Sequence, residues 1–214
     1  NMRLGLNYMQ RGDYEIALEK LEKSLKQDPN LPSAHETIAL LYQRLGVLDK
    51  AEKHFKEAIN RAPTYSEAHN NYGVFLCQQG RYEESEKHFL TAVKNPLYNK
   101  SAQAIENAGL CVSRIPDLVR AEAHFHKALQ INPNMSKSIL HLAEISYQQQ
   151  DYQQAKGYMK RYQSVSLWGP QALLITIKIE NKLGEKDEVA SHILLLKGKF
   201  PDSDQAQQVR RGEY

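Results

Sequence analysis

The chain has 214 residues, of which 41% are apolar and 25% are charged, so it can bury a core as one or two domains. Its net charge is only +3 and no run of five like charges occurs, so the sequence gives no support for a basic patch that binds nucleic acid or membrane. No stretch approaches the ~18 consecutive apolar residues of a membrane-spanning helix. The chain opens with Asn1 without the regions of a signal peptide, which fits a cytosolic protein or the trimmed product of an exported precursor.

The sequence repeats itself with a period of about 34 residues. The second and third units align at Gly46 and Gly80, Phe55 and Phe89, and Ala58 and Ala92. We predict six units over residues 1–31, 32–65, 66–99, 102–135, 136–169 and 170–202, and a capping helix over 203–211. Each unit is expected to hold two helices that bury their apolar faces only by stacking on the next unit.

Three residue classes explain the spacing. Small residues are expected where the two helices of a unit cross closely, at Gly5, Ala39, Gly73, Gly109 and Ala143. Glycines are expected to turn the chain between helices, at Gly12, Gly46, Gly80 and Gly184. Prolines are expected to follow the second helices, at Pro29, Pro63, Pro133 and Pro201. This pattern resembles the tetratricopeptide repeat, and it predicts an all-α, right-handed superhelix of about six such repeats, an α-solenoid forming one domain over 1–214.

The same pattern predicts a binding groove along the first helices of the units. The residues expected to line it are Met2, Leu6, Met9, Gln10, Leu40, Arg44, Asn70 and Val74. The apolar stripe that begins at Met2 favours an extended or helical apolar peptide as the ligand. The alternative is that this stripe packs against a helix upstream of Asn1. Co-chaperones of this repeat class that grip a C-terminal carboxylate use Lys and Asn at set inward positions. Those positions hold Glu36, Leu40 and Val74 here, and Asn70 and Asn71 lack the basic partners, so we do not expect that clamp.

Nothing in the sequence indicates catalysis. Nucleotide-binding loops, serine-hydrolase elbows and zinc-protease motifs are absent. His54, His88, His124 and His192 occupy one repeat position, and residues in repeat register lie about one hairpin apart, too far to share a zinc ion. We therefore expect a binding scaffold with no catalytic residue, no cofactor, no metal and no nucleic-acid ligand.

Several segments go beyond a generic repeat. They are Asn71–Cys77, Asn95–Tyr98, Glu106–Cys111 and Leu196–Ser203. Together they resemble the PilW/PilF family of type IV pilus biogenesis proteins over nearly the whole chain. The resemblance implies a pilotin, an outer-membrane lipoprotein facing the periplasm that helps the pilus secretin reach the outer membrane and multimerise. The lipidated cysteine would lie outside these residues, the lipid would be the only membrane contact, and the protein is expected to be a monomer.

Cys77 and Cys111 are compatible with two packed thiols or with one disulfide. The periplasmic location that the resemblance implies favours the disulfide, because that compartment is oxidising. Two alternative functions remain open at this point. One is a cytosolic repeat scaffold or co-chaperone, and the other is a repeat subunit that regulates an enzyme.

Overall fold

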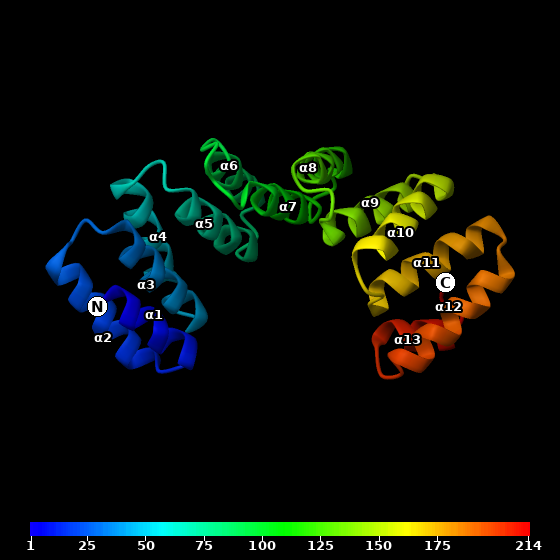
Figure 1. Cartoon of the computed structure of the whole chain (residues 1–214), viewed down its shortest axis with the longest axis horizontal. Coiled ribbons are helices and arrows are strands. Elements are labelled where there is room, and N and C mark those ends of the chain that lie inside the picture. The colour runs from blue at the N-terminus through cyan, green and yellow to red at the C-terminus, as the bar shows by residue number, and fades with distance from the viewer. The chain divides into compact units, whose positions relative to one another are not determined.

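The computed structural model describes residues 1–214 and consists of thirteen helices without a strand (Figure 1). The chain divides into two compact units, residues 1–116 and 117–214, and each is described by itself. The division falls inside the fourth expected repeat, between its two helices. The all-α repeat fold predicted from the sequence is confirmed.

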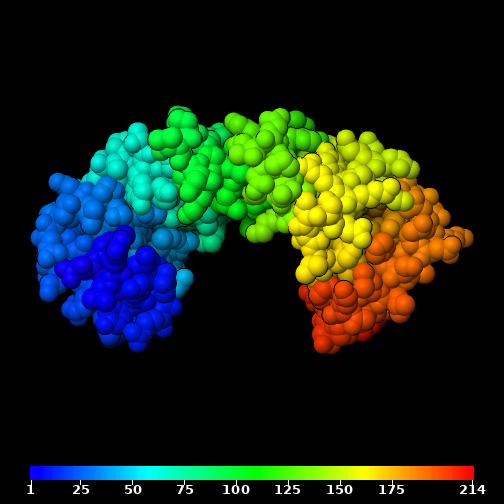
Figure 2. All heavy atoms as spheres, in the orientation of Figure 1, coloured from blue at the N-terminus to red at the C-terminus, as the bar shows by residue number.

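Unit 1 contains three complete helical hairpins and a seventh helix. Its helices are α1 (Met2–Arg11), α2 (Tyr14–Gln27), α3 (Pro32–Arg44), α4 (Leu48–Arg61), α5 (Ser66–Gln78), α6 (Tyr82–Ala92) and α7 (Ser101–Val112). Among the first helices, α1 contacts α3, α3 contacts α5 and α5 contacts α7, whereas the second helices α2, α4 and α6 make no such contacts with one another. The first helices therefore form the inner side of the stack in unit 1. In Figure 2 the atoms of successive hairpins in this unit pack continuously on the face shown.

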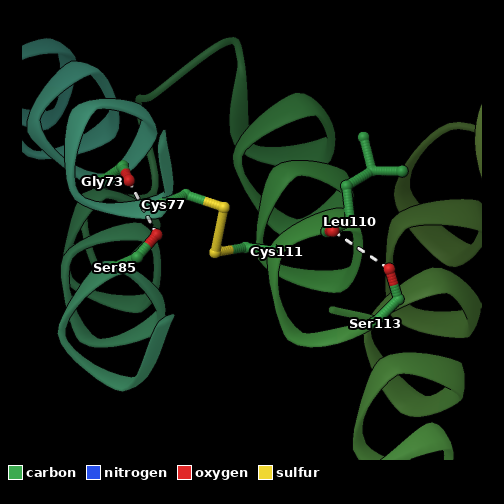
Figure 3. The surroundings of a disulfide bond; sticks show 6 residues. All are labelled: Gly73, Cys77, Ser85, Leu110, Cys111 and Ser113. Carbon is green, nitrogen blue, oxygen red and sulfur yellow. Dashed lines mark hydrogen bonds between the residues drawn. A yellow bond between two sulfur atoms is a disulfide. The ribbon is translucent and has the colours of Figure 1, made fainter. Parts of the chain in front are cut away.

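Close crossing of the two helices in a hairpin depends on small residues, as predicted. A Cβ atom on Gly5 would lie 2.6 Å from Leu21 Cγ, and one on Gly73 would lie 2.8 Å from Phe89 Cε1. The Ser85 hydroxyl donates a 2.7 Å hydrogen bond to the Gly73 carbonyl, which ties α6 to α5 at this crossing (Figure 3). The aromatic ring of Phe89 thus occupies the space that the missing glycine side chain leaves.

The ends of the helices follow the predicted turn chemistry. Gly12, Gly46, Gly80 and Gly184 have φ between 74° and 88°, a left-handed conformation that costs glycine little. Each predicted proline lies two residues after the end of a second helix, for example Pro63 after Arg61. In the fifth repeat the left-handed position is held by Gln150, with φ 66°.

Unit 2 contains two hairpins, one further second helix and the cap. Its helices are α8 (Leu118–Ile131), α9 (Ser136–Gln148), α10 (Tyr152–Val165), α11 (Pro170–Leu183), α12 (Lys186–Lys199) and α13 (Asp204–Arg210). The short helix α13 packs on α11 and α12, where Ala206 and Val209 join a core cluster with Leu173, Ile177 and Leu196. This matches the cap expected over 203–211. None of the thirteen helices has both the length and the hydropathy needed to cross a bilayer.

Candidate partner-binding surface

The candidate surface is the inner side of unit 1, built by α1, α3, α5 and α7, and is called the inner face below. At its N-terminal end Met2 and Leu6 are half-buried and Gln10 is exposed, as a groove lining requires. Met9 differs from the prediction, because its side chain is only 7% exposed and packs in a core cluster with Leu21 and other residues of α2 and α3. Met9 supports this wall from behind and offers no surface to a ligand.

The predicted groove residues of α3 contribute one apolar and one charged group. Leu40 is half-buried and packs at the edge of the core cluster around Phe55, so part of its side chain stays accessible. Arg44 is exposed, and its guanidinium donates a 3.4 Å hydrogen bond to the carbonyl of Met9. This contact links the first two repeats across the inner face.

A chain of polar side chains runs across α3, α5 and α7. Glu36 is 7% exposed and accepts hydrogen bonds from the hydroxyl of Tyr65 and, at 2.6 Å, from Asn71 Nδ2. Asn70 Nδ2 donates to Asn71 Oδ1, and Asn107 Nδ2 donates to Asn70 Oδ1, both at 3.2 Å. Burial raises the pKa of Glu36, while the two donors oppose that shift. The sequence placed Glu36 and Asn70 on this face, but the link between them required the packing of α3 on α5.

Val74, the last predicted groove residue, lies beside the two cysteines. A disulfide joins Cys77 on α5 to Cys111 on α7, with the Cα atoms 5.8 Å apart (Figure 3). It therefore fixes two neighbouring first helices to each other. Val74, Leu110 and the disulfide line a cavity of about 160 Å³ on the inner face.

Two histidine pairs stand out on the hairpins of the second and third repeats. His35 Nδ1 lies 3.1 Å from His54 Nδ1, and His69 Nδ1 lies 2.9 Å from His88 Nδ1. Repeat register equates His35 with His69 and His54 with His88, so it did not predict these pairs between the two positions of a single hairpin. Each pair joins the first helix of its hairpin to the second.

Two histidines of unit 2 have carboxylate partners instead. His192 Nδ1 lies 2.9 Å from a carboxylate oxygen of Glu180, and this hydrogen bond raises the pKa of His192. His141 Nδ1 lies 2.8 Å from Glu144, whose pKa is lowered by hydrogen bonds from His141 and Gln171 against the opposing effect of burial. No group of three or more His, Cys, Asp or Glu side chains is arranged to hold a metal ion.

Two larger cavities lie at the loops between repeats. One of about 420 Å³ is lined by Pro32, Ser33, Ala62, Thr64 and Tyr65. Another of about 500 Å³ is lined by Pro63, Thr64, Thr91, Lys94 and Asn95. Neither cavity is lined by a residue of the predicted groove, so we place the candidate site on the inner face.

Comparisons with known proteins agree with this geometry. A family model described as TPR repeat matches residues 5–46, and models described as tetratricopeptide repeat match 32–65, 54–87 and 117–164. The chain is therefore a tetratricopeptide-repeat protein, a class whose members bind peptides or proteins.

The relatives define the family more narrowly. The chain is 30% identical to the type IV pilus assembly protein PilF of Pseudomonas aeruginosa over 94% of this chain and 80% of that protein. A solved structure of P. aeruginosa PilF matches with a TM-score of 0.88 and 30% identity, covering 99% of this chain and 95% of the other. The crystal structure of PilW, described as a widely conserved type IV pilus biogenesis factor, matches with a TM-score of 0.84 and 32% identity over 98% and 96%. This chain belongs to the PilF/PilW family of tetratricopeptide-repeat proteins.

Proposed function

We propose that the protein is a non-enzymatic scaffold of type IV pilus biogenesis, and that it acts as a pilotin for the pilus secretin. In this role it binds a secretin subunit and assists its outer-membrane localisation and multimerisation. Family membership supports the link to pilus biogenesis, since both PilF and PilW carry that description. The secretin as partner follows from the family resemblance noted in the sequence.

The observation that carries the binding role is the inner face of unit 1. Leu6, Leu40 and Val74 expose part of their apolar surface there, one on each of three successive first helices. Amide and carboxylate groups, including Asn70, accompany this apolar row. An apolar row with polar groups beside it suits a peptide segment or amphipathic helix of the partner.

The disulfide supports a location in the cell envelope over the cytosolic alternative. Structural disulfides persist in oxidising compartments, and cytosolic thiols are kept reduced. The disulfide between Cys77 and Cys111 joins two helices of the proposed binding surface. An oxidising compartment would therefore preserve the link between these two helices. We propose that the protein is a monomer at the periplasmic side of the outer membrane and that a lipid anchor holds it there.

A binding experiment with purified secretin tests the proposal. Leu40→Glu places a charge in the apolar row, and we expect it to weaken secretin binding at least tenfold because the buried charge would lack a partner. Leu194→Glu is the matched control, since Leu194 is 74% exposed on α12 and lies outside unit 1. Leu6→Glu is a second groove variant, and the melting temperature of each variant reports on folding.

The outcomes distinguish the pilotin role from the choice of binding surface. If the parent and the control bind secretin and the folded groove variants do not, both the role and the inner face are supported. Equal binding by all variants would support the pilotin role and would exclude the inner face as the binding surface. Failure of the parent to bind secretin, with recovery of cytosolic chaperones from a whole lysate, moves the assignment to a cytosolic scaffold.

A further inference from the structure

The cavity at the disulfide has the size of a pocket for a single side chain. It is called the disulfide pocket below, and its lining residues are Val74, Cys77, Gln78, Phe89, Asn107, Leu110, Cys111 and Arg114. Its volume of about 160 Å³ equals that of roughly five water molecules in the liquid. That is room for the four or five heavy atoms of an aliphatic side chain.

The interior of the disulfide pocket is apolar. Phe89 is 1% exposed and Cys111 is fully buried, so the pocket is backed by the core of the hairpin. Val74 and Leu110 are half-buried and form its walls. An apolar side chain that enters would leave water for apolar neighbours, which is favourable in proportion to the area it buries.

The polar atoms at the disulfide pocket have spare hydrogen-bond donors. Gln78 Oε1 accepts from Gln43 Nε2 at 2.7 Å, which leaves both hydrogens of Gln78 Nε2 available. Asn107 Oδ1 accepts from Gln103 at 3.2 Å, while Asn107 Nδ2 uses one of its two hydrogens on Asn70. Each amide oxygen already accepts one hydrogen bond, and both amide nitrogens keep unused N–H donors.

Arg114 adds an unpaired positive charge to these donors. Its guanidinium makes no hydrogen bond or ion pair, whereas Arg44, at the corresponding position two repeats earlier, donates to the Met9 carbonyl. No aspartate or glutamate is among the residues that line the disulfide pocket. Spare amide donors and a free guanidinium beside an apolar cavity select an anion, and a carboxylate fits a guanidinium best through two parallel hydrogen bonds.

We propose that the disulfide pocket binds a residue of a partner peptide whose aliphatic side chain enters the cavity and whose neighbouring carboxylate is held by Arg114, Gln78 and Asn107. The carboxylate is either the end of a chain or an adjacent aspartate or glutamate side chain. This site differs from the lysine-based clamp that the sequence lacks, because its cation is an arginine in the turn that follows α7. The proposal deepens the proposed function by naming the feature of the secretin segment that the inner face recognises, and it rests on that function only for the identity of the partner.

Small probes test the pocket without the secretin. The measurement is a titration of the whole protein followed by NMR of the Val74 and Leu110 methyl groups and of the Arg114 Nε–H group. N-acetyl-leucine carries both recognised groups, N-acetyl-leucinamide lacks the carboxylate, and N-acetylglycine lacks the side chain. We expect saturable shifts at these three residues with N-acetyl-leucine, and binding weaker by about tenfold for the other two probes. A fourth probe, acetyl-leucyl-aspartyl-amide, carries the carboxylate on a side chain, and its affinity relative to N-acetyl-leucine decides between the two sources.

Arg114→Gln is the decisive variant, because Arg114 is exposed and its loss should leave the fold intact. We expect it to abolish the preference for N-acetyl-leucine over N-acetyl-leucinamide. Arg3→Gln removes the same charge from an exposed position of α1 and should keep the preference. Equal affinity for the two probes in the parent, no saturable shift, or shifts spread over the basic surface would each overturn the proposal.

Secretin binding by the same variants separates this inference from the proposed function. Loss of secretin binding in Arg114→Gln but not in Arg3→Gln supports both. If the parent binds secretin but shows no preference between the probes, the pilotin role is supported and the pocket proposal is refuted. If the parent binds N-acetyl-leucine through Arg114 but does not bind secretin, the pocket proposal is supported and the pilotin role is refuted.

Discussion

The Nδ1 atoms of His69 and His88 lie 2.9 Å apart, with His69 Nε2 3.0 Å from the carbonyl oxygen of Pro63. His69 therefore donates its Nε2 hydrogen to Pro63 and accepts a hydrogen from His88 at Nδ1. A second proton on His69 would place two N–H groups against each other. This hydrogen bond between α5 and α6 is therefore lost once His69 is protonated, because its Nδ1 can then no longer accept.

The first prediction is a loss of stability in mild acid. Burial, followed by the facing histidine, lowers the pKa of His54 and of His88 to about 4. Because the folded state favours the neutral rings, their contribution is complete above the unfolded pKa of ~6.5 and is lost as pH falls from there towards 4. We expect roughly 1 kcal/mol per pair over this range, since both rings are half-buried and partly screened. Urea denaturation at pH 7 and pH 4.5 measures it.

A histidine variant tests whether the His69–His88 pair causes this loss of stability in acid. The fourth repeat has Ile105 where the third has His69, so His69→Ile is compatible with the hairpin and should reduce the difference in unfolding free energy between the two pH values. His126→Gln is the control, because His126 is exposed on α8 and belongs to neither pair. An unchanged difference in His69→Ile would rule out the pair as its source.

The sequence predicted the features that depend on local or periodic chemistry. Helix ends at Gly12 and Pro63 and the close crossing at Gly73 follow from what glycine and proline can do at fixed repeat positions. Contacts between residues on the two helices of one hairpin could not be predicted. Repeat register identifies equivalent residues in different repeats, but it does not show which residues of one repeat contact each other. The His69–His88 pair and the burial of Met9 both arise from how one helix rotates against another.

The second prediction concerns the link between α5 and α7. The disulfide joins residues separated by 34 positions, and closing a loop of that length in the unfolded chain stabilises the fold by about 3–4 kcal/mol in the chain-entropy model. We expect a reductant to lower the urea midpoint accordingly. The double variant Cys77→Ala/Cys111→Ala should start at the lower midpoint and be insensitive to reductant. A midpoint shared by oxidised and reduced parent would contradict the prediction.

The third prediction tests the crossing of α5 and α6. Gly73→Ala would bring a Cβ atom to 2.8 Å from Phe89 Cε1, so the ring must move within a packed core. We expect destabilisation by about 1–3 kcal/mol in urea denaturation. Gly157→Ala is the matched control, because a Cβ atom there meets nothing within 4 Å on helix α10. That variant should be more stable than the parent by up to about 1 kcal/mol through helix propensity, and destabilisation of both variants alike would refute the packing argument.

The fourth prediction uses the turn in which a residue other than glycine adopts the left-handed conformation. Gln150 adopts φ 66°, a left-handed conformation that an L-residue with a Cβ atom reaches only at a cost, whereas Gly80 holds the corresponding position of the third repeat with φ 76°. We expect Gln150→Gly to stabilise the protein by about 0.5–1 kcal/mol, because relief of this strain exceeds the greater freedom that glycine gives the unfolded chain. Gly80→Gln should lose a similar amount. Gln148→Gly, two residues earlier on helix α9, should also lose stability, since glycine there only weakens a helix. Urea midpoints of the three variants give the comparison, and a loss of stability in Gln150→Gly would mean that the side chain of Gln150 contributes more than its backbone strain costs.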